Sequence, residues 1–201
     1  MKIAMFGGSF DPVHKAHVRL CERMITDFDL DKVIVFPAAS SPFKDTTETS
    51  PEHRLNMCRL AFGDIDKVEV SDYEIKRGGK SYTIDTLNFL KSEYPDSELY
   101  LIVGGDAFSS LDKWHKAKEI FNMSHILTIV RDNHDLYSIG LKKNEYEMLG
   151  AKVDLVDSSV GGISSTKARE LLIADDDDIT RLLPHCVIDY IKENNLYGYE
   201  N

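Results

Sequence analysis

A stretch near the start of the chain, GGSFDPVHKAH at residues 7–17, concentrates residue types that can bind anions or metals. Its two glycines follow an apolar, strand-like run and let the backbone approach a ligand closely before it turns into a helix near Val13. A helix N-terminus presents free N–H groups and a partial positive charge, which suit phosphate oxygens. Because the dinucleotide fingerprint G-x-G-x-x-G is absent here, the glycines by themselves indicate either a phosphate cradle or a plain tight turn.

Two histidines, His14 and His17, are three residues apart, so in a helix they project from the same face of the first turn. A tetrahedral zinc site would need further ligands, and neither H-E-x-x-H nor C-x-x-C occurs in the chain to supply them. The pair can instead be structural, or it can donate hydrogen bonds to phosphate oxygens. The last interpretation agrees with the anion-binding character of the same helix start.

A second segment of this kind, ISSTKAR at residues 163–169, follows two glycines far along the chain. Ser164, Ser165 and Thr166 provide hydroxyls and backbone N–H groups at another helix start. The planar guanidinium of Arg169 can reach back one turn to a phosphate. A Ser-Ser-Thr helix cap is common by itself, but two anion-binding segments in one chain suggest a polyphosphate held between them.

Short apolar runs alternate with amphipathic stretches along the whole sequence. This alternation predicts βαβ units, and hence an α/β, Rossmann-like, doubly wound and mainly parallel sheet with helices on both faces. Ser50 and Pro51 mark a clear helix start. We expect strands at 2–6, 33–36, 68–70, 99–103, 126–130 and 153–156, and helices at 14–28, 51–62, 83–93, 114–121, 167–173 and 184–194. In such a fold, ligands bind beyond the carboxyl ends of the strands where the strand order reverses.

The composition describes an ordinary globular protein of 201 residues with a formal net charge of −10. That charge argues against a protein that coats nucleic acid, and no apolar run is long enough to cross a membrane, so we expect a cytoplasmic location. We expect one domain over residues 1–201, with a small helical appendage at 163–201 that carries the second segment. The acidic run 175–178 reads as a solvated connector. Three widely spaced cysteines, Cys21, Cys58 and Cys186, are expected to be buried free thiols.

The opening stretch closely resembles the G-x-F-x-P-x-H-x-G-H motif of the α/β nucleotidyltransferases, and ISSTKAR resembles the I-S-S-T-x-x-R motif of their adenylyl-transferring members. Within that superfamily the chain is similar to the bacterial nicotinate-nucleotide adenylyltransferase family over nearly its whole length. Further matches, in the same order and spacing, are Pro37 with Ser41-Pro42-Phe43-Lys44, Glu52-His53-Arg54, the run Ser81 to Leu87, Gly104-Gly105-Asp106, Trp114, and Leu183-Pro184 through Leu196-Tyr197.

The resemblance implies an enzyme that transfers AMP from ATP to nicotinate mononucleotide, with Mg²⁺ arriving on the ATP and no protein-held metal. Catalytic roles then fall to His14, His17, Lys44 and Arg169. ATP contacts are expected from Gly7, Gly8, Ser9, Phe10, His17, Gly104, Asp106, Ile163, Ser164, Ser165, Thr166 and Arg169. Mononucleotide contacts are expected from Ser9, Lys44, Tyr82, Thr83, Trp114 and Arg131. For Asp106 helix capping competes with ribose binding, for Trp114 core packing competes with stacking on the pyridine ring, and for Thr83 helix capping competes with a substrate contact.

Two positions depart from the family pattern. Ala16 stands where the motif has glycine, and the chain reads Arg131-Asp132-Asn133-His134 where the family usually has Arg-Pro-Gly. Two alternatives stay open: a pantetheine-phosphate adenylyltransferase, which shares the first motif, and a nucleotide-binding sensor without turnover. Homo-oligomerisation and the selection between nicotinate and nicotinamide are also left open by the sequence.

Overall fold

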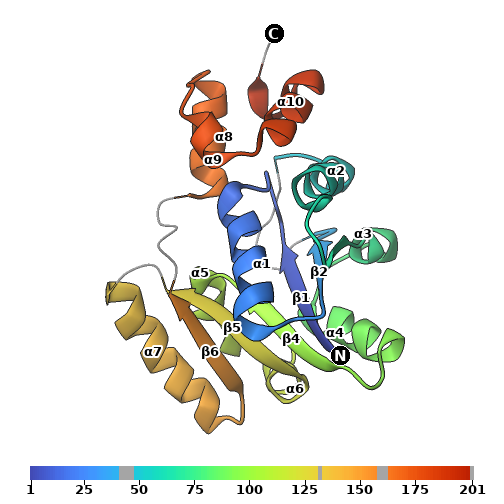
Figure 1. The fold of residues 1–201 in the computed structure, drawn as a ribbon, viewed down its shortest axis with the longest axis vertical. Helices are drawn as coiled ribbons and strands as arrows, with labels where there is room; N and C mark the ends of the chain where they lie inside the picture. The colour runs from blue at the N-terminus through green and yellow to red at the C-terminus, as the bar shows by residue number, and fades with distance from the viewer. Residues whose placement is uncertain (41–47, 131–132, 158–162, 200–201) are drawn as a thin grey trace.

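A single sheet of six strands runs through the computed structural model, which describes residues 1–40, 48–130, 133–157 and 163–199. The strands are β1 (Lys2–Gly8), β2 (Lys32–Pro37), β3 (Val68–Val70), β4 (Glu98–Val103), β5 (Ser124–Val130) and β6 (Lys152–Asp157). Their order is β3-β2-β1-β4-β5-β6, and each of these pairings is parallel (Figure 1). The predicted doubly wound parallel sheet is therefore confirmed, with its order reversing between β1 and β4.

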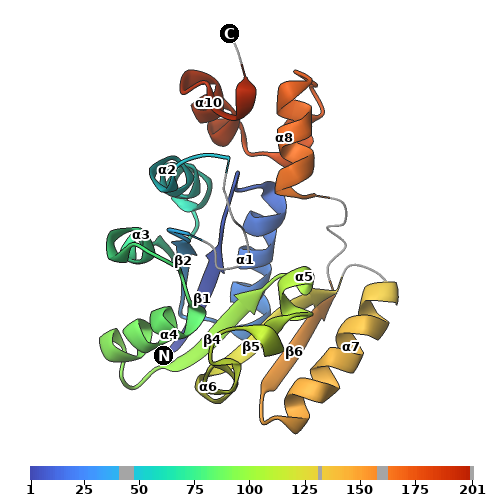
Figure 2. The ribbon, with the colours of Figure 1, turned by 180° about the vertical axis from the view of Figure 1, so that it is seen from behind.

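Helices cover both faces of this sheet, as Figures 1 and 2 show from opposite sides. They are α1 (Lys15–Phe28), α2 (Pro51–Phe62), α3 (Tyr73–Arg77), α4 (Thr83–Glu93), α5 (Gly105–Phe108), α6 (Ala117–Met123), α7 (Asn133–Met148), α8 (Ser165–Ile173), α9 (Ile179–Leu182) and α10 (His185–Glu193), with short 3-10 turns η1 (Leu111–Lys113) and η2 (Leu196–Gly198). The six predicted helices are present within about three residues of their expected bounds. The helix expected from 114 begins only at Ala117, because η1 precedes it.

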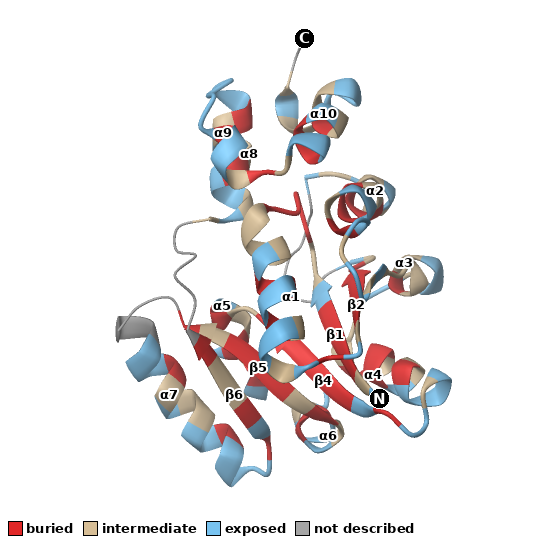
Figure 3. Ribbon diagram, viewed as in Figure 1, coloured by how far each residue is buried: buried red, intermediate tan, exposed pale blue. Residues whose placement is uncertain are grey.

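Two apolar layers form the core, one on each face of the sheet. Along β1, Ala4 and Phe6 point to the layer made with α1, α2 and α10, and Ile3 and Met5 point to the layer made with α4, α6 and α7. This alternation follows from the two-residue period of a strand. Figure 3 shows buried residues along the central strands. The loops after β1 and β4 therefore start from strands that are packed on both faces.

The helices that follow residue 163 pack beside the start of α1 and along α2 (Figure 1). The Tyr190 hydroxyl accepts a hydrogen bond of 3.0 Å from Asn56 on α2, and Lys15 on α1 donates one of 2.7 Å to the Thr180 carbonyl. The acidic run 175–178 is exposed between α8 and α9, as predicted. The appendage is thus tied to the β1 side of the sheet.

The cysteine prediction is confirmed for two residues and wrong for the third. Cys21 and Cys58 are buried free thiols, and burial raises the pKa of Cys21 to about 12. Cys186 is also free but exposed, because it lies in the first turn of α10 at the margin of the contact with α2. Its thiol donates to the Leu60 carbonyl at 3.4 Å.

The N-cap of α2 gives a stability prediction. The Ser50 hydroxyl accepts a hydrogen bond of 3.3 Å from the backbone N–H of His53. Ser50→Ala should lower the free energy of unfolding by about 1 kcal/mol, since one N–H of the first turn loses its partner. Ser92→Ala, on the exposed side of α4, is the control and should stay within about 0.5 kcal/mol of the parent protein. Equal urea midpoints for the two variants would contradict the assignment of the cap.

Candidate active site

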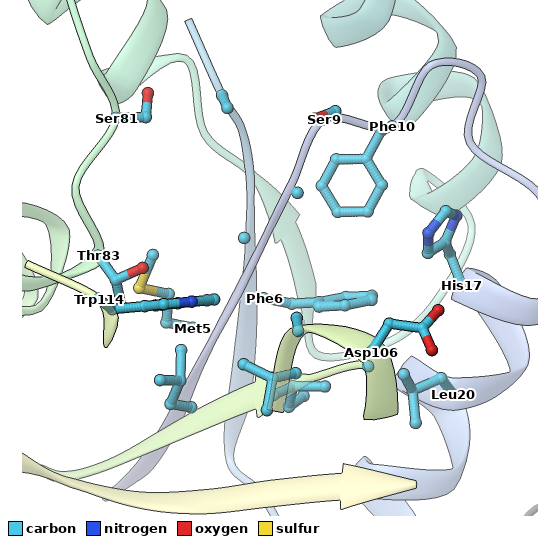
Figure 4. Close-up of a pocket in the computed structure, with 18 of the residues that line it drawn as sticks. Met5, Phe6, Ser9, Phe10, His17, Leu20, Ser81, Thr83, Asp106 and Trp114 are labelled. Atoms are coloured by element: carbon cyan, nitrogen blue, oxygen red, sulfur yellow. The ribbon is translucent and has the colours of Figure 1, made fainter. Parts of the chain in front are cut away.

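A cavity of about 550 Å³ opens at the carboxyl ends of β1 and β4, where the strand order reverses. Its base is formed by the ends of these two strands, and its walls come from the loop before α1, the start of α4, the segment around Trp114 and the start of α8. Figure 4 shows Trp114 and Thr83 on one side of this space and His17 and Asp106 on the other. The cavity lies at the position where this class of fold binds ligands.

The loop between β1 and α1 carries the first predicted anion site. Gly8 is constrained by its neighbour, because a Cβ there would come within 3.0 Å of the Phe10 ring. Phe10 adopts a left-handed backbone conformation with φ of 49°, and the Asp11-Pro12 peptide bond is cis. The helix begins at Lys15, one residue after the predicted start at His14, and His14 is its N-cap. The absence of a side chain at Gly8 thus leaves room for the Phe10 ring as well as for a ligand.

The two histidines lie side by side at the start of α1, as predicted, with His14 at the N-cap and His17 in the first turn, and both line the cavity. Their rings stack with centroids 3.6 Å apart, and the Phe10 ring contacts His17 edge-on at 5.0 Å. The backbone N–H of His14 donates to Nδ1 of His17 at 3.2 Å. Since Nδ1 accepts this bond, the proton of the His17 ring lies on Nε2, which makes Nε2 a hydrogen-bond donor.

The ISSTKAR segment meets this loop directly, although the two lie far apart in sequence. Ile163, Ser164 and Ser165 line the cavity, and Ser164 caps α8 by accepting a 3.2 Å hydrogen bond from Lys167 N–H. The Ser165 hydroxyl donates to the Pro12 carbonyl at 2.9 Å. The structure therefore brings the two predicted anion-binding segments together at one cavity wall.

Arg169 and Thr166 are described but are not among the residues that line the cavity. Arg169 instead donates from Nη1 to the main-chain oxygen of Asp11 at 2.7 Å. Its guanidinium has five N–H groups, so this bond occupies one donor and fixes where the others lie. Lys44 and Arg131 fall outside the described residues.

A buried polar network supports the loop from behind, and sequence reasoning missed its roles. Asp11 is 5% exposed, and its carboxylate accepts hydrogen bonds from the Tyr197 hydroxyl at 2.8 Å and from Glu48 N–H at 2.7 Å. Arg54 is fully buried and donates to the carbonyls of Ser9 at 2.7 Å and Ala39 at 3.3 Å. Asp11, Arg54 and Tyr197 belong to the quoted motifs, but nothing in their spacing indicated that they belong to one network.

The electrostatics of this network keep the side chains of Tyr197 and Arg54 protonated, so both remain hydrogen-bond donors. Burial raises the pKa of Tyr197, and the neighbouring Asp11 carboxylate raises it further, so the hydroxyl remains a donor at physiological pH. Burial lowers the pKa of Arg54, while Asp11 opposes this change. An arginine stays protonated under such conditions. Asp11 therefore lies between a permanent cation and a permanent hydroxyl donor.

The opposite wall is aromatic and hydroxyl-bearing. Trp114 follows η1 rather than lying in a helix, and its ring lies beside Thr83 in Figure 4. Tyr82 occupies the N-cap position of α4, so the capping role considered for Thr83 is wrong. The Tyr82 ring packs against His115 with centroids 4.7 Å apart. This wall presents a flat apolar surface with hydroxyls at its edge.

Asp106 lies in the first turn of α5, directly after β4, and lines the cavity. Gly104 takes the N-cap position of that helix, so capping by Asp106 is not the arrangement observed. Figure 4 shows the Asp106 carboxylate on the same side as His17. Within the described ranges, no cluster of three or more His, Cys, Asp or Glu side chains is arranged to hold a metal ion.

Comparisons with known proteins identify the family of this chain. The cytidylyltransferase-like family model matches residues 5–171. A probable nicotinate-nucleotide adenylyltransferase of Geobacter sp. (strain M21) is 36% identical over 213 aligned residues, which cover 98% of each chain. This chain belongs to the nicotinate-nucleotide adenylyltransferase family. A second member, from Oceanobacillus iheyensis, is 35% identical over 98% of this chain and 97% of its own.

Solved structures agree with the fold. A Plasmodium falciparum nicotinic acid mononucleotide adenylyltransferase in complex with NaAD has a TM-score of 0.82 at 23% identity, covering 99% of this chain and 98% of its own. A second structure, from Vibrio parahaemolyticus, has a TM-score of 0.70. The solved structures confirm the fold, and the relatives of 35–36% identity confirm the predicted family and its enzyme class. These relatives favour the adenylyltransferase over the pantetheine-phosphate enzyme and the non-catalytic sensor. Ala16, where the family motif has glycine, lies in the first turn of α1 and lines the cavity.

The bond between Tyr197 and Asp11 gives a second prediction. Tyr197→Phe removes one donor from a buried carboxylate and should lower the free energy of unfolding by about 1.5–3 kcal/mol. Because Asp11 precedes His14 in the same loop, ATP affinity measured by calorimetry should also fall. Tyr199→Phe is the control, since its ring keeps the contact with Lys192. Identical unfolding curves for the two variants would show that the Tyr197 hydroxyl contributes nothing.

Proposed function

We propose that this protein transfers AMP from ATP to nicotinate mononucleotide, forming deamido-NAD and releasing pyrophosphate. The observation that supports this most directly is the cavity at the strand-order reversal, which joins a wall of helix starts and histidines to an aromatic wall. The wall of helix starts and histidines suits a polyphosphate, and the aromatic wall suits a planar ring. The names of the family members point to the same reaction.

In the proposed reaction, an oxygen of the mononucleotide 5′-phosphate attacks the α-phosphorus of ATP. A new P–O bond forms, the bond from the α-phosphorus to the bridging oxygen breaks, and pyrophosphate leaves. The attacking phosphate has a second pKa of about 6, so near neutral pH it needs no general base. Catalysis then depends on alignment and on stabilisation of charge at the α-phosphate and the leaving group.

The phosphate-binding side falls to the β1–α1 loop and the start of α8. We assign Nε2 of His17 as a donor to the reacting phosphate, with His14 stacked behind it. Gly7, Gly8, Ser9 and Phe10 shape the backbone there, and Ile163, Ser164 and Ser165 contribute the second helix start. We further propose that Thr166, Arg169 and Lys44 complete this side, with Arg169 turning its remaining donors towards the β- and γ-phosphates.

The remaining contacts are assigned by position. We propose that Trp114 stacks on the pyridine ring, that Tyr82 and Thr83 form hydrogen bonds at its edge, and that Asp106 and Gly104 bind the ribose. Arg131 is proposed as a further mononucleotide contact. Mg²⁺ bound to ATP would neutralise charge on the leaving pyrophosphate. The described lining residues include two carboxylates, Asp106 and Glu74. So few acidic side chains suit Mg²⁺, which usually keeps several water ligands and binds to substrate phosphates.

Residues 1–201 are proposed to form one nucleotidyltransferase domain, of which 163–201 is the helical part. Since ATP and nicotinate mononucleotide are its proposed partners, we place the protein in the cytoplasm, without a nucleic acid or membrane partner. Among the described residues, no helix has the length and apolar character needed to span a bilayer. Light scattering on the purified protein distinguishes a monomer from a homo-oligomer.

The deciding experiment follows pyrophosphate release from Mg-ATP. The purified protein is incubated separately with nicotinate mononucleotide, nicotinamide mononucleotide and phosphopantetheine, and the first should give the highest rate. Release chiefly with phosphopantetheine would reassign the substrate. Release with none of the three would overturn the proposed activity.

Replacing His17 tests the assigned donor. His17→Ala should lower kcat by about 10²–10³-fold, the size of effect seen when one preorganised donor to a developing anion is removed. His125→Asn is the control, because His125 pairs with Asp154 at 2.8 Å on the sheet, away from the described cavity lining. A His17→Ala variant that unfolds at the parent temperature and keeps its kcat would rule out this role.

A further inference from the structure

One carboxyl group in the cavity wall has no part in the proposed chemistry. Glu74, on the short helix α3, is 3% exposed and lines the cavity together with Ser81, Tyr82 and Thr83. A buried carboxyl group is costly unless hydrogen bonds compensate for the lost water. A buried carboxyl group at the aromatic end of the cavity therefore indicates that Glu74 has a role beyond packing.

Glu74 interacts with side chains on both sides of the Tyr82-Thr83 pair. The Thr86 hydroxyl, in the first turn of α4, donates to Oε1 at 2.6 Å, and the nearby Ser81 hydroxyl lowers the pKa of the same carboxyl group. Burial raises the pKa of Glu74, while these two hydroxyls lower it. The Glu74 side chain thus contacts Ser81, which precedes Tyr82-Thr83, and Thr86, which follows them in the first turn of α4.

Ser81 extends the same contact to the loop after β2. Its hydroxyl accepts a hydrogen bond of 3.0 Å from Ala39 N–H, and its own N–H donates to the Ser40 carbonyl at 2.9 Å. A hydroxyl has one proton to donate and lone pairs to accept, so Ser81 can satisfy Glu74 and Ala39 together. The carboxyl group of Glu74 is therefore linked to two loops that border the cavity.

We propose that Glu74 is a positioning residue that sets the geometry of the pyridine end of the site, and with it the selection of the mononucleotide, by holding Ser81 and Thr86 on either side of Tyr82-Thr83. This inference rests on the proposed function. Glu74 acts through its neighbours. We assign ATP to the opposite wall, so a substitution at Glu74 should leave ATP binding unchanged.

The test uses the isosteric variant Glu74→Gln in the full-length protein. An amide retains one oxygen acceptor for the Thr86 hydroxyl, while its NH₂ group cannot accept from Ser81 and the negative charge is lost, so the interaction with Ser81 changes. We expect KM for nicotinate mononucleotide to rise about tenfold, KM for ATP to change less than twofold, and the preference for nicotinate over nicotinamide mononucleotide to fall. Asp154→Asn makes the same chemical change at a carboxylate bound to His125 and should leave both KM values unchanged.

A pair of variants at Thr86 keeps the test decisive if Glu74→Gln does not fold. Thr86→Val removes the hydroxyl and should reproduce the selective rise in KM, whereas Thr86→Ser retains a hydroxyl and should restore the parent value. Unchanged KM for the mononucleotide in the folded variants, or equal rises in both KM values with a lowered melting temperature, would overturn the positioning role. Calorimetric binding of nicotinate mononucleotide to the parent and variant proteins separates this failure from an absence of turnover in the parent.

Discussion

Asp11 links the two predicted anion-binding segments, because its main-chain oxygen and its carboxylate both accept hydrogen bonds from the C-terminal part of the chain. Arg169 of α8 donates to the main-chain oxygen, and Tyr197 donates to the carboxylate. Glu48, before α2, donates to the other carboxylate oxygen. The loop that carries His14 is therefore fixed by the C-terminal helical part as well as by the sheet.

This arrangement explains why so much buried charge lies near one cavity. Asp11, Arg54 and Glu74 are each at most 5% exposed, and each would be costly without partners. The hydrogen bonds of Arg54 and Glu74 go to the loops after β1 and β2 and to the start of α4, and the Asp11 carboxylate is bonded by Glu48 and Tyr197. Buried charge that is satisfied by loop atoms limits loop motion, which is the preorganisation that a reaction without a general base requires.

The two walls of the cavity differ in chemistry because they come from elements that pack on opposite faces of the sheet. The loop after β1 and the start of α8 present helix N-termini and stacked imidazoles. The start of α4 and the segment around Trp114 present aromatic rings and hydroxyls. The reversal of strand order between β1 and β4 leaves the space in which these walls face each other.

The sequence by itself determined what depends on near neighbours. Alternating apolar runs predicted the six strands, Ser50 with Pro51 predicted the start of α2, and the spacing of His14 and His17 placed them on one face. It did not predict α3, α5, α7 or α9. The long helix α7 leaves Leu136, Tyr137 and Leu141 largely exposed, so its apolar residues do not mark one buried face. Only the tertiary structure decided that Arg169 bonds to Asp11, that Tyr197 supports the same residue and that Glu74 joins Ser81 to Thr86. These contacts depend on how distant segments pack, and residue type and spacing do not specify which distant atom a side chain will reach.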